Sequence, residues 1–176
     1  MPRLPRPVLI ALFLAGCATA PPVAVQELSP GTARVVGDGR TSLVVAMQTH
    51  LIVFDAPPSE AGTNRLLEAA RAKFGPKPVR YVVLADPGAV ASLRPLVAQG
   101  AEVIVGAGGA AALRRELGGA RIVEIRNRYV LADEKRQVEL FPLANGALAG
   151  CVPDANVGYA AGATTDCDAL RRPGGR

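Results

Sequence analysis

The chain has 176 residues, of which 49% are hydrophobic and 20% are charged. This length and composition fit a single domain with a substantial core and exclude a largely disordered chain. The formal net charge is +5, but the basic residues are scattered, and the chain contains three Tyr, four Phe and no Trp. Because aromatic residues are not interleaved among basic ones, no nucleic-acid partner is expected.

Residues 1–16 have the parts of a secretory signal peptide. Arg3 and Arg6 precede a short apolar run, Val8–Leu14, and small residues follow it. The apolar run is too short to cross a bilayer as a permanent helix. The segment therefore predicts export of the protein and removal of the signal.

The end of this segment, Leu14-Ala15-Gly16-Cys17, resembles the bacterial lipobox. In that motif the cysteine becomes the diacylated first residue of the mature protein, so the resemblance implies lipidation of Cys17 and attachment to a membrane. The residue after the cysteine is Ala18 and not an aspartate. By resemblance to the sorted lipoproteins of Gram-negative bacteria, this implies a lipoprotein on the periplasmic side of the outer membrane. The alternatives are an ordinary signal peptide with a chance cysteine, or a plain apolar anchor.

Export changes the expected state of the other cysteines. If Cys17 carries lipid, Cys151 and Cys167 remain as an even pair in an oxidising compartment. A disulfide between them would stabilise the domain by about 3 kcal/mol on the chain-entropy model. The alternative is a pair of free thiols whose geometry forbids the bond.

Three segments are expected after the signal. Residues 17–30 contain three prolines and suit a lipidated N-terminus with a short tether. The folded domain is expected over residues 31–165, with no internal repeat and no second domain boundary. Residues 166–176 contain three arginines and are expected to form a basic, solvated tail.

Hydrophobic patterns within the domain predict strands that alternate with helices. Helices are expected at Ser59–Phe74, Ser92–Gly100 and Ala110–Leu117, with Ser92 as the N-cap of the second, and a turn is expected at Gly37-Asp38-Gly39. Strands are expected at Ala33–Val36, Ser42–Met47, Leu51–Phe54, Val79–Leu84, Glu102–Val105, Arg121–Ile125, Arg128–Leu131, Arg136–Leu143, Ala147–Val152 and Val157–Ala161. This order predicts an α/β (α+β) class with a mixed sheet and flanking helices.

Two segments resemble a known family. The stretch Val79–Gly106 runs from a strand through a short loop and a helix to a second strand, and an earlier strand ends in Val53-Phe54-Asp55-Ala56-Pro57. Both resemble the metallo-β-lactamase fold, and the resemblance extends from about Leu28 to Ala163. It implies the first half and an incomplete second half of an αββα sandwich, with a site along the edge between the two halves.

The metal ligands of that family are missing from this sequence. In the family, the loop after the first of these strands carries a T-H-x-H-x-D-H motif, whereas the loop from Ala85 to Ser92 contains no histidine. A later histidine position falls in residues 144–147, which also contain none, and the bridging aspartate position matches Gly162-Ala163. The degenerate positions are Ala85, Asp86, Pro87, Ala91 and Ala163. The resemblance therefore implies a fold without its zinc, and no cofactor is expected unless zinc occupies an atypical site.

Two further residues have candidate roles. Asp55 matches an aspartate that in the family supports the metal loop from behind the ligands. The alternative for Asp55 is a carboxylate at a strand end that bonds a nearby backbone amide. His50, the only histidine in the chain, matches no ligand motif, and its position between two strands predicts a surface turn.

A glycine-rich loop offers a different function. Gly106, Gly108 and Ala111 match G-x-G-x-x-[GA] between a predicted strand and a predicted helix, and Glu124 ends the next strand. This pattern indicates dinucleotide binding, or anion binding by the loop from Gly106 through Gly108 to Gly109. The alternative is a tight connection between strand and helix in a chain rich in glycine and alanine.

Together these features predict an exported, lipid-anchored protein that has lost its metal centre. It would act as a non-catalytic binding or structural protein of the envelope, or as a degenerate hydrolase, and therefore as a pseudoenzyme. One alternative is a metal-dependent hydrolase whose site is atypical or completed by a partner; the other is dinucleotide or anion binding. The incomplete second half also predicts an exposed sheet edge, where a second copy or a partner protein would dock.

Overall fold

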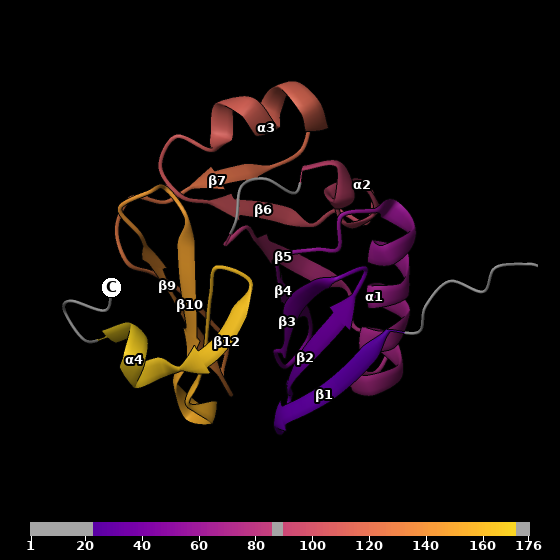
Figure 1. Cartoon of the computed structure of the whole chain (residues 1–176), viewed down its shortest axis with the longest axis vertical. Coiled ribbons are helices and arrows are strands. Elements are labelled where there is room, and N and C mark those ends of the chain that lie inside the picture. Colours follow the sequence, from indigo (N-terminus) through magenta and orange to yellow (C-terminus); the bar gives the residue numbers. More distant parts are fainter. Residues whose placement is uncertain (1–22, 86–89, 172–176) are drawn as a thin grey trace, which may run out of the picture.

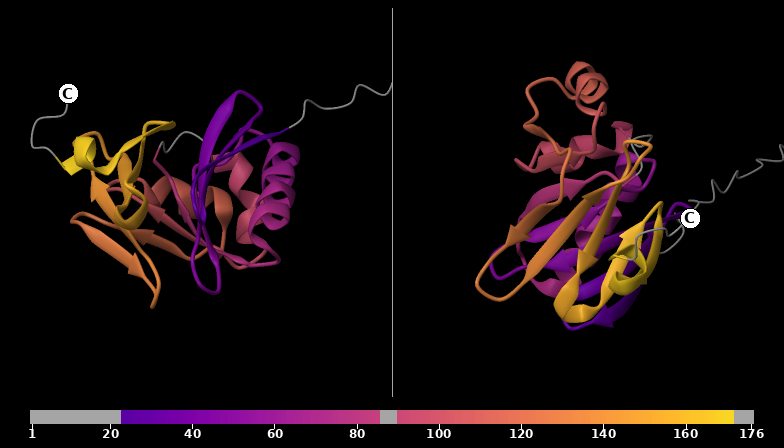
Figure 2. Two further views of the ribbon diagram at one scale, coloured as in Figure 1. Left: turned by 90° about the horizontal axis from the view of Figure 1, so that it is seen from below. Right: turned by 90° about the vertical axis from the view of Figure 1, so that its left-hand side faces the viewer.

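The computed structural model describes residues 23–85 and 90–171. Two β-sheets pack against each other, and three helices cover the outer face of the larger sheet (Figure 1). Seen from below, the helices, the larger sheet and the smaller sheet form successive layers (Figure 2). The predicted α/β class with a mixed sheet and flanking helices is confirmed.

Sheet A has seven strands in the order β1-β2-β3-β4-β5-β6-β7. Neighbouring strands from β1 to β4 are antiparallel, and those from β4 to β7 are parallel. The strands are β1 (Ala24–Ser29), β2 (Thr32–Gly37), β3 (Arg40–Ala46), β4 (Leu51–Phe54), β5 (Val79–Val83), β6 (Glu102–Val105) and β7 (Ile122–Glu124). The parallel strands are connected by α1 (Glu60–Phe74), the 3-10 turn η1 (Val90–Leu93) with α2 (Arg94–Val97), and α3 (Ala110–Leu117).

Sheet B has five antiparallel strands in the order β12-β11-β10-β9-β8. The strands are β8 (Tyr129–Ala132), β9 (Gln137–Pro142), β10 (Leu148–Val152), β11 (Val157–Ala160) and β12 (Ala163–Asp166). A 3-10 turn, η2 (Pro153–Ala155), connects β10 to β11, and α4 (Cys167–Arg171) follows β12.

Two hydrophobic cores hold the layers together. Val53 belongs to the core between the helices and sheet A, whereas its neighbour Phe54 belongs to the core between the two sheets. This division follows from the alternation of side chains along a strand. Gly150 of β10 makes the close approach of the sheets possible, because a Cβ atom there would lie 2.1 Å from the Phe54 ring.

The first helix has both of its expected end signals. Ser59 is the N-cap of α1, and its Oγ accepts a hydrogen bond of 2.9 Å from the Gly62 amide. Gly75 ends the helix with a φ of 83°, a conformation that favours glycine. The prediction of a helix over Ser59–Phe74 is therefore confirmed.

The second predicted helix is shorter than the sequence indicated, and Ser92 is not its N-cap. Leu93 precedes α2 and provides no side-chain cap. Ser92 lies in the preceding 3-10 turn and is buried, and its carbonyl oxygen accepts a hydrogen bond of 2.9 Å from Thr63 Oγ1. Ser92 therefore contacts α1 and does not cap α2.

Regular structure also extends beyond the predicted domain limits. Residues 24–29, which the sequence assigned to the tether, form β1, because pairing with β2 satisfies the backbone groups of both strands. At the other end, Cys167–Arg171 forms α4 where a solvated tail was expected. The residues assigned to the signal peptide and to lipidation, Cys17 included, lie outside the described residues. In the part of the chain that is described, no helix is both long enough and apolar enough to span a membrane.

Helix α4 is fastened to the outer face of sheet B by two kinds of bond. A disulfide joins Cys167 of α4 to Cys151 of β10, with 5.2 Å between their Cα atoms, as the cysteine pairing predicted. Beside it, the Glu139 side chain is 3% exposed and forms ion pairs with Arg171 at 3.1 Å and with Arg128 at 2.7 Å. The two arginines compensate the charge of this buried carboxylate.

Candidate functional site

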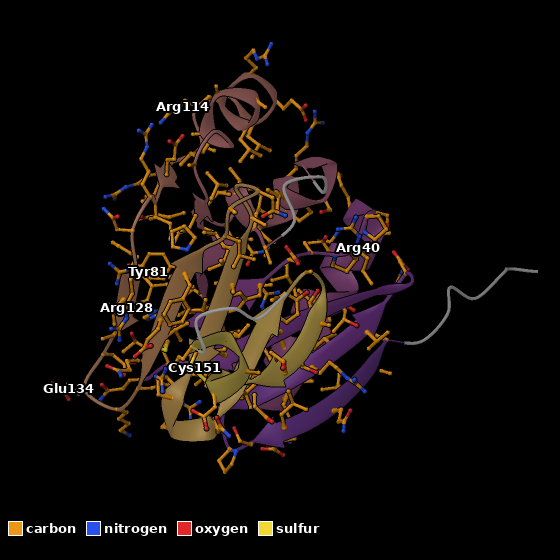
Figure 3. All side chains as sticks on the ribbon, turned by 60° about the vertical axis from the view of Figure 1, so that its left-hand side comes forward. Arg40, Tyr81, Arg114, Arg128, Glu134 and Cys151 are labelled. Atoms are coloured by element: carbon orange, nitrogen blue, oxygen red, sulfur yellow. A yellow bond between two sulfur atoms is a disulfide. The ribbon has the colours of Figure 1, made fainter. Side chains whose placement is uncertain are left out.

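A pocket of about 290 Å³ lies at the carboxyl end of β4, at the edge between the two sheets. We call it the Arg40 pocket. Its lining residues come from the turn between β2 and β3, the end of β4, and the turn between β11 and β12: Gly39, Arg40, Thr41, Asp55, Ala161 and Gly162. Figure 3 shows Arg40 on the hairpin of sheet A.

Two tight hairpin turns, one from each sheet, build the pocket. In sheet A, Asp38 and Gly39 connect the paired residues Gly37 and Arg40 and have φ values of 52° and 74°. In sheet B, Ala161-Gly162 forms a turn of the same length, with φ values of 49° and 76°. Positive φ at both central residues matches the type I′ turn that suits a two-residue hairpin. Asp-Gly is a favoured sequence for it, whereas the alanine at 161 is strained.

The first turn is held against the start of α1 by Asp38. Its carboxylate accepts hydrogen bonds from Ser59 Oγ at 2.6 Å and from Arg65 Nη2 at 2.5 Å. The hydrogen bond from Ser59, aided by the charge of Arg65, lowers the pKa of Asp38 below its ordinary value of 3.8, against the opposing effect of desolvation. Arg40, two residues along, therefore starts β3 from a fixed turn.

Asp55 occupies the end of β4 with a φ of 52° and is 1% exposed. Its Oδ1 accepts a hydrogen bond of 2.8 Å from the Ala85 amide. This contact combines the two roles considered for Asp55: it bonds a backbone amide, and that amide belongs to the first residue of the loop that carries the metal motif in the resembled family.

Tyr159 of β11 is a member of this site that the sequence did not indicate. The side chain is fully buried, and its hydroxyl lies 3.0 Å from Asp55 Oδ2 and 2.6 Å from the Thr41 carbonyl oxygen. Its ring packs on Phe54 with 5.6 Å between centroids. The signal in the sequence was a tyrosine within an apolar strand. A buried tyrosine hydroxyl needs a polar partner, so this tyrosine could have indicated a polar group nearby.

The described side chains around the Arg40 pocket do not fit a zinc ion. Its lining residues supply one carboxylate, Asp55, and one guanidinium, Arg40. Zinc sites in proteins use three or four ligands from cysteine, histidine and carboxylate side chains. Within residues 23–85 and 90–171, no three such side chains gather in a group that could hold a metal. Among the described residues, the charged side chains that line the pocket are thus one cation and one carboxylate.

The degenerate positions are distributed over several elements. Ala85 is buried beside Asp55, whereas Ala163 begins β12 and is exposed. Ala91 lies in η1. Asp86 and Pro87 lie outside the described residues.

The glycine-rich loop between β6 and α3 has structural partners. A Cβ atom at Gly106 would lie 2.1 Å from the Gly146 carbonyl oxygen, so glycine is needed there for one loop to pack on another. Glu124 accepts hydrogen bonds from Arg126 and from the Gly108 and Ala110 amides, which together lower its pKa. The Glu124 carboxylate thus already provides an anion at the start of α3. Gly109 directly precedes this helix without a side-chain cap.

His50 is buried, contrary to the predicted surface turn. It is 8% exposed, because its ring packs edge-on against Tyr81 with 5.6 Å between centroids. Burial, followed by the charge of Arg80, lowers the pKa of His50 below its ordinary 6.5, and Asp133 opposes the shift. His50 precedes β4, whereas Asp55 follows that strand, so the histidine lies away from the Arg40 pocket.

Solved structures with a similar arrangement include two metallo-beta-lactamases. The enzyme from Pontibacter korlensis superposes with a TM-score of 0.62 at 16% identity, covering 75% of this chain and 67% of its own. The one from Cronobacter sakazakii gives 0.61 at 17% identity, covering 82% and 61%. A fragment of a putative diflavin flavoprotein from Nostoc gives 0.63 at 17% identity, covering 78% and 65%.

The comparisons concern the fold, since no family model and no curated protein sequence matches this chain. The chain spans between 61% and 67% of the length of the three solved structures. The likeness extends over both sheets, because each superposition covers at least 75% of the chain. The protein has the metallo-β-lactamase fold.

Proposed function

We propose that this protein is an exported, lipid-anchored envelope protein whose domain binds a ligand at the Arg40 pocket without a metal. The observation that carries the proposal is the donor set of the pocket, in which a guanidinium and a single carboxylate occupy the edge between the two sheets. Asp55 is bonded to the Ala85 amide and lies within hydrogen-bond distance of the Tyr159 hydroxyl, so it has structural partners of its own.

Two similar structures are described as metallo-beta-lactamases, which makes a metal-dependent hydrolase the natural comparison. Such a hydrolase needs ligands that hold a metal and leave a position open for water. One carboxylate and one arginine do not supply these ligands. We therefore propose that the protein keeps the fold and binds a ligand, without the metal-dependent hydrolysis.

Export and lipidation are supported by the sequence and by the disulfide. The signal, ending in Leu14-Ala15-Gly16-Cys17, has the form of a lipoprotein signal. A disulfide between buried cysteines is typical of a protein that folds in an oxidising compartment. A tether of a few residues between Cys17 and β1 would keep the domain close to the membrane.

Thermal unfolding with zinc or with a chelator tests the metal-free role. A ligand that binds only the folded state raises the free energy of unfolding, by about 4 kcal/mol when its concentration is a thousand times Kd. We expect untagged protein to unfold at the same temperature in micromolar zinc and in excess chelator. A metallo-β-lactamase with intact ligands serves as the positive control. A rise in the unfolding temperature with zinc would favour the hydrolase with an atypical site.

A further inference from the structure

We infer that edge strand β8 pairs with β8 of a second copy of the protein, in the antiparallel direction. The two copies are related by a two-fold axis, and sheet B continues from one copy into the other. This interface is separate from the Arg40 pocket and goes beyond the binding role proposed above. Three properties of β8 support the pairing, namely its open edge, its apolar side chains and the charges that flank it.

The backbone of β8 has an open edge. Among the described strands, β8 is the last of sheet B and pairs with β9 alone. The Asp133 amide donates to the Arg136 carbonyl oxygen across the hairpin turn, and ladder bonds alternate along the strand from there. The N–H and C=O groups of Leu131 and Tyr129 therefore face β9, whereas those of Val130 face the open edge. In the right-hand view of Figure 2, the orange hairpin of β8 and β9 lies at the margin of the molecule.

The other edge strands are protected against such pairing. The pairing of β1 shifts register between Glu27 and Ser29, β7 has three residues, and β12 has the polar sequence ATTD. Strand β8 contains no proline and pairs with β9 without a register shift, and its Tyr129 and Val130 side chains are 41% and 43% exposed. Bulges, polar residues and short length keep an edge strand unpaired, so β8 is the edge most open to a partner.

The charges that flank β8 favour a second copy in the antiparallel direction. Arg126 and Arg128 precede the strand, and Glu134 follows it in the hairpin turn. Figure 3 shows Arg128 and Glu134 on the same side of the molecule. Two antiparallel copies centred on Val130 place Arg126 of each opposite Glu134 of the other. Parallel copies would place like charges side by side, which is destabilising.

Both partners of this contact are accessible. Glu134 is exposed and forms no ion pair with the described residues. Arg126 is 77% exposed and binds Glu124, but a guanidinium has five N–H donors and one carboxylate does not occupy them all. Lys135, the other cation of the turn, lies opposite Ile125 in this register and not opposite Arg126, so it does not oppose the contact.

Disulfide trapping in cells that express the full-length protein tests the pairing. Val130→Cys places one thiol at the centre of the register, where the two copies approach within disulfide distance. We expect a mild oxidant to yield a covalent dimer of two copies of this chain. Arg114→Cys, on the exposed surface of α3, is the matched control and should remain largely monomeric. The wild type, with its own three cysteines, gives the background.

Exchange of the charges tests the direction of the pairing. In the Val130→Cys background, Arg126→Glu or Glu134→Arg alone should reduce the yield of dimer by about fivefold or more, because each repulsive contact occurs twice across the two-fold axis. The two substitutions together restore the attraction, and the yield should return to that of Val130→Cys. Thermal unfolding of each variant checks that the fold is retained.

A yield of dimer for Val130→Cys no higher than for Arg114→Cys would overturn the inference. A covalent product in which mass spectrometry finds a different protein would also overturn it, because the edge would then serve another partner. Single charge variants that form as much dimer as Val130→Cys would exclude the antiparallel register.

Discussion

At the scale of single residues, the pocket depends on how two turns are encoded. Gly37-Asp38-Gly39 is recognisable in the sequence, because Asp-Gly is a favoured pair for a two-residue hairpin turn. The Ala161-Gly162 turn is not recognisable, because alanine rarely adopts the positive φ of 49° that it has here. The pairing of β11 with β12 imposes this conformation, and only the folded chain reveals it.

Gly62 tests the contact between the first turn and α1. Replacing a helical glycine by alanine ordinarily stabilises a helix by about 1 kcal/mol. Here a Cβ atom would lie 2.1 Å from Asp38 Oδ2 and 2.8 Å from Pro57 Cβ. We expect Gly62→Ala to destabilise the protein by about 1–3 kcal/mol, measured by denaturant unfolding. Stabilisation by the variant would show that Asp38 is not held against the helix.

The buried His50 gives a prediction for pH dependence. Because its pKa is lowered in the folded state, the unfolded chain takes up a proton more readily when the pH falls. Above pH 6.5, the ordinary pKa of histidine, His50 is neutral in both states and does not reduce the free energy of unfolding. As the pH falls from there toward the lower pKa of the folded state, the free energy of unfolding decreases. As the chain has one histidine, its ring resonance reports this pKa without ambiguity.

We expect the ring of His50 to titrate below pH 6.5 in untagged protein. In His50→Gln, the part of the stability loss that begins below this pH should disappear, because glutamine does not titrate. A ring that titrates at or above 6.5 would contradict the burial of His50 against Tyr81.

At the scale of elements, prediction succeeded where hydrophobic periodicity was strong. The apolar strands Leu51–Phe54 and Glu102–Val105 have the bounds that the sequence indicated. The edge strand β1 was missed, because its residues 24–27 are exposed and its sequence resembles a polar connection. Helix α4 was missed for another reason: it has five residues and is held by contacts with sheet B.

The disulfide gives the prediction at this scale. The bond closes a sequence separation of 16 residues between β10 and α4. We expect the double variant Cys151→Ala with Cys167→Ala to lose about 2–4 kcal/mol of unfolding free energy. Arg171→Ala, which leaves the disulfide in place but removes an exposed partner of Glu139, is the matched control and should lose less. A double variant as stable as the wild type would show that α4 does not depend on the bond.

At the scale of the whole molecule, the fold was predictable and the site only in part. The order of strands and helices and the family resemblance led to the two-sheet architecture that is observed. Asp55 was identified from a short segment, but Arg40 and Tyr159 were not. Tyr159 reaches Asp55 only through the packing of sheet B on sheet A, and no motif in the sequence marked Arg40. Docking of a second copy or a partner at a sheet edge stays a prediction. Edge strand β8 exposes Tyr129 and Val130 there.

The proposed attachment to the membrane is also tested on the whole molecule. We expect Cys17→Ser to release the full-length protein from the membrane fraction, because the lipid-accepting thiol is lost. Cys151→Ser alone is the matched control and should leave the protein in the membrane fraction. Unchanged fractionation of Cys17→Ser would argue against lipidation.

The central claim is that this fold is retained with an arginine pocket in place of a zinc centre. Elemental analysis of untagged protein, purified without chelator from cells grown with ample zinc, tests it most directly. The expected result is far less than one zinc or iron ion per chain, unchanged in Arg40→Gln. One tightly held ion of zinc or iron per chain, retained through gel filtration, would contradict the claim.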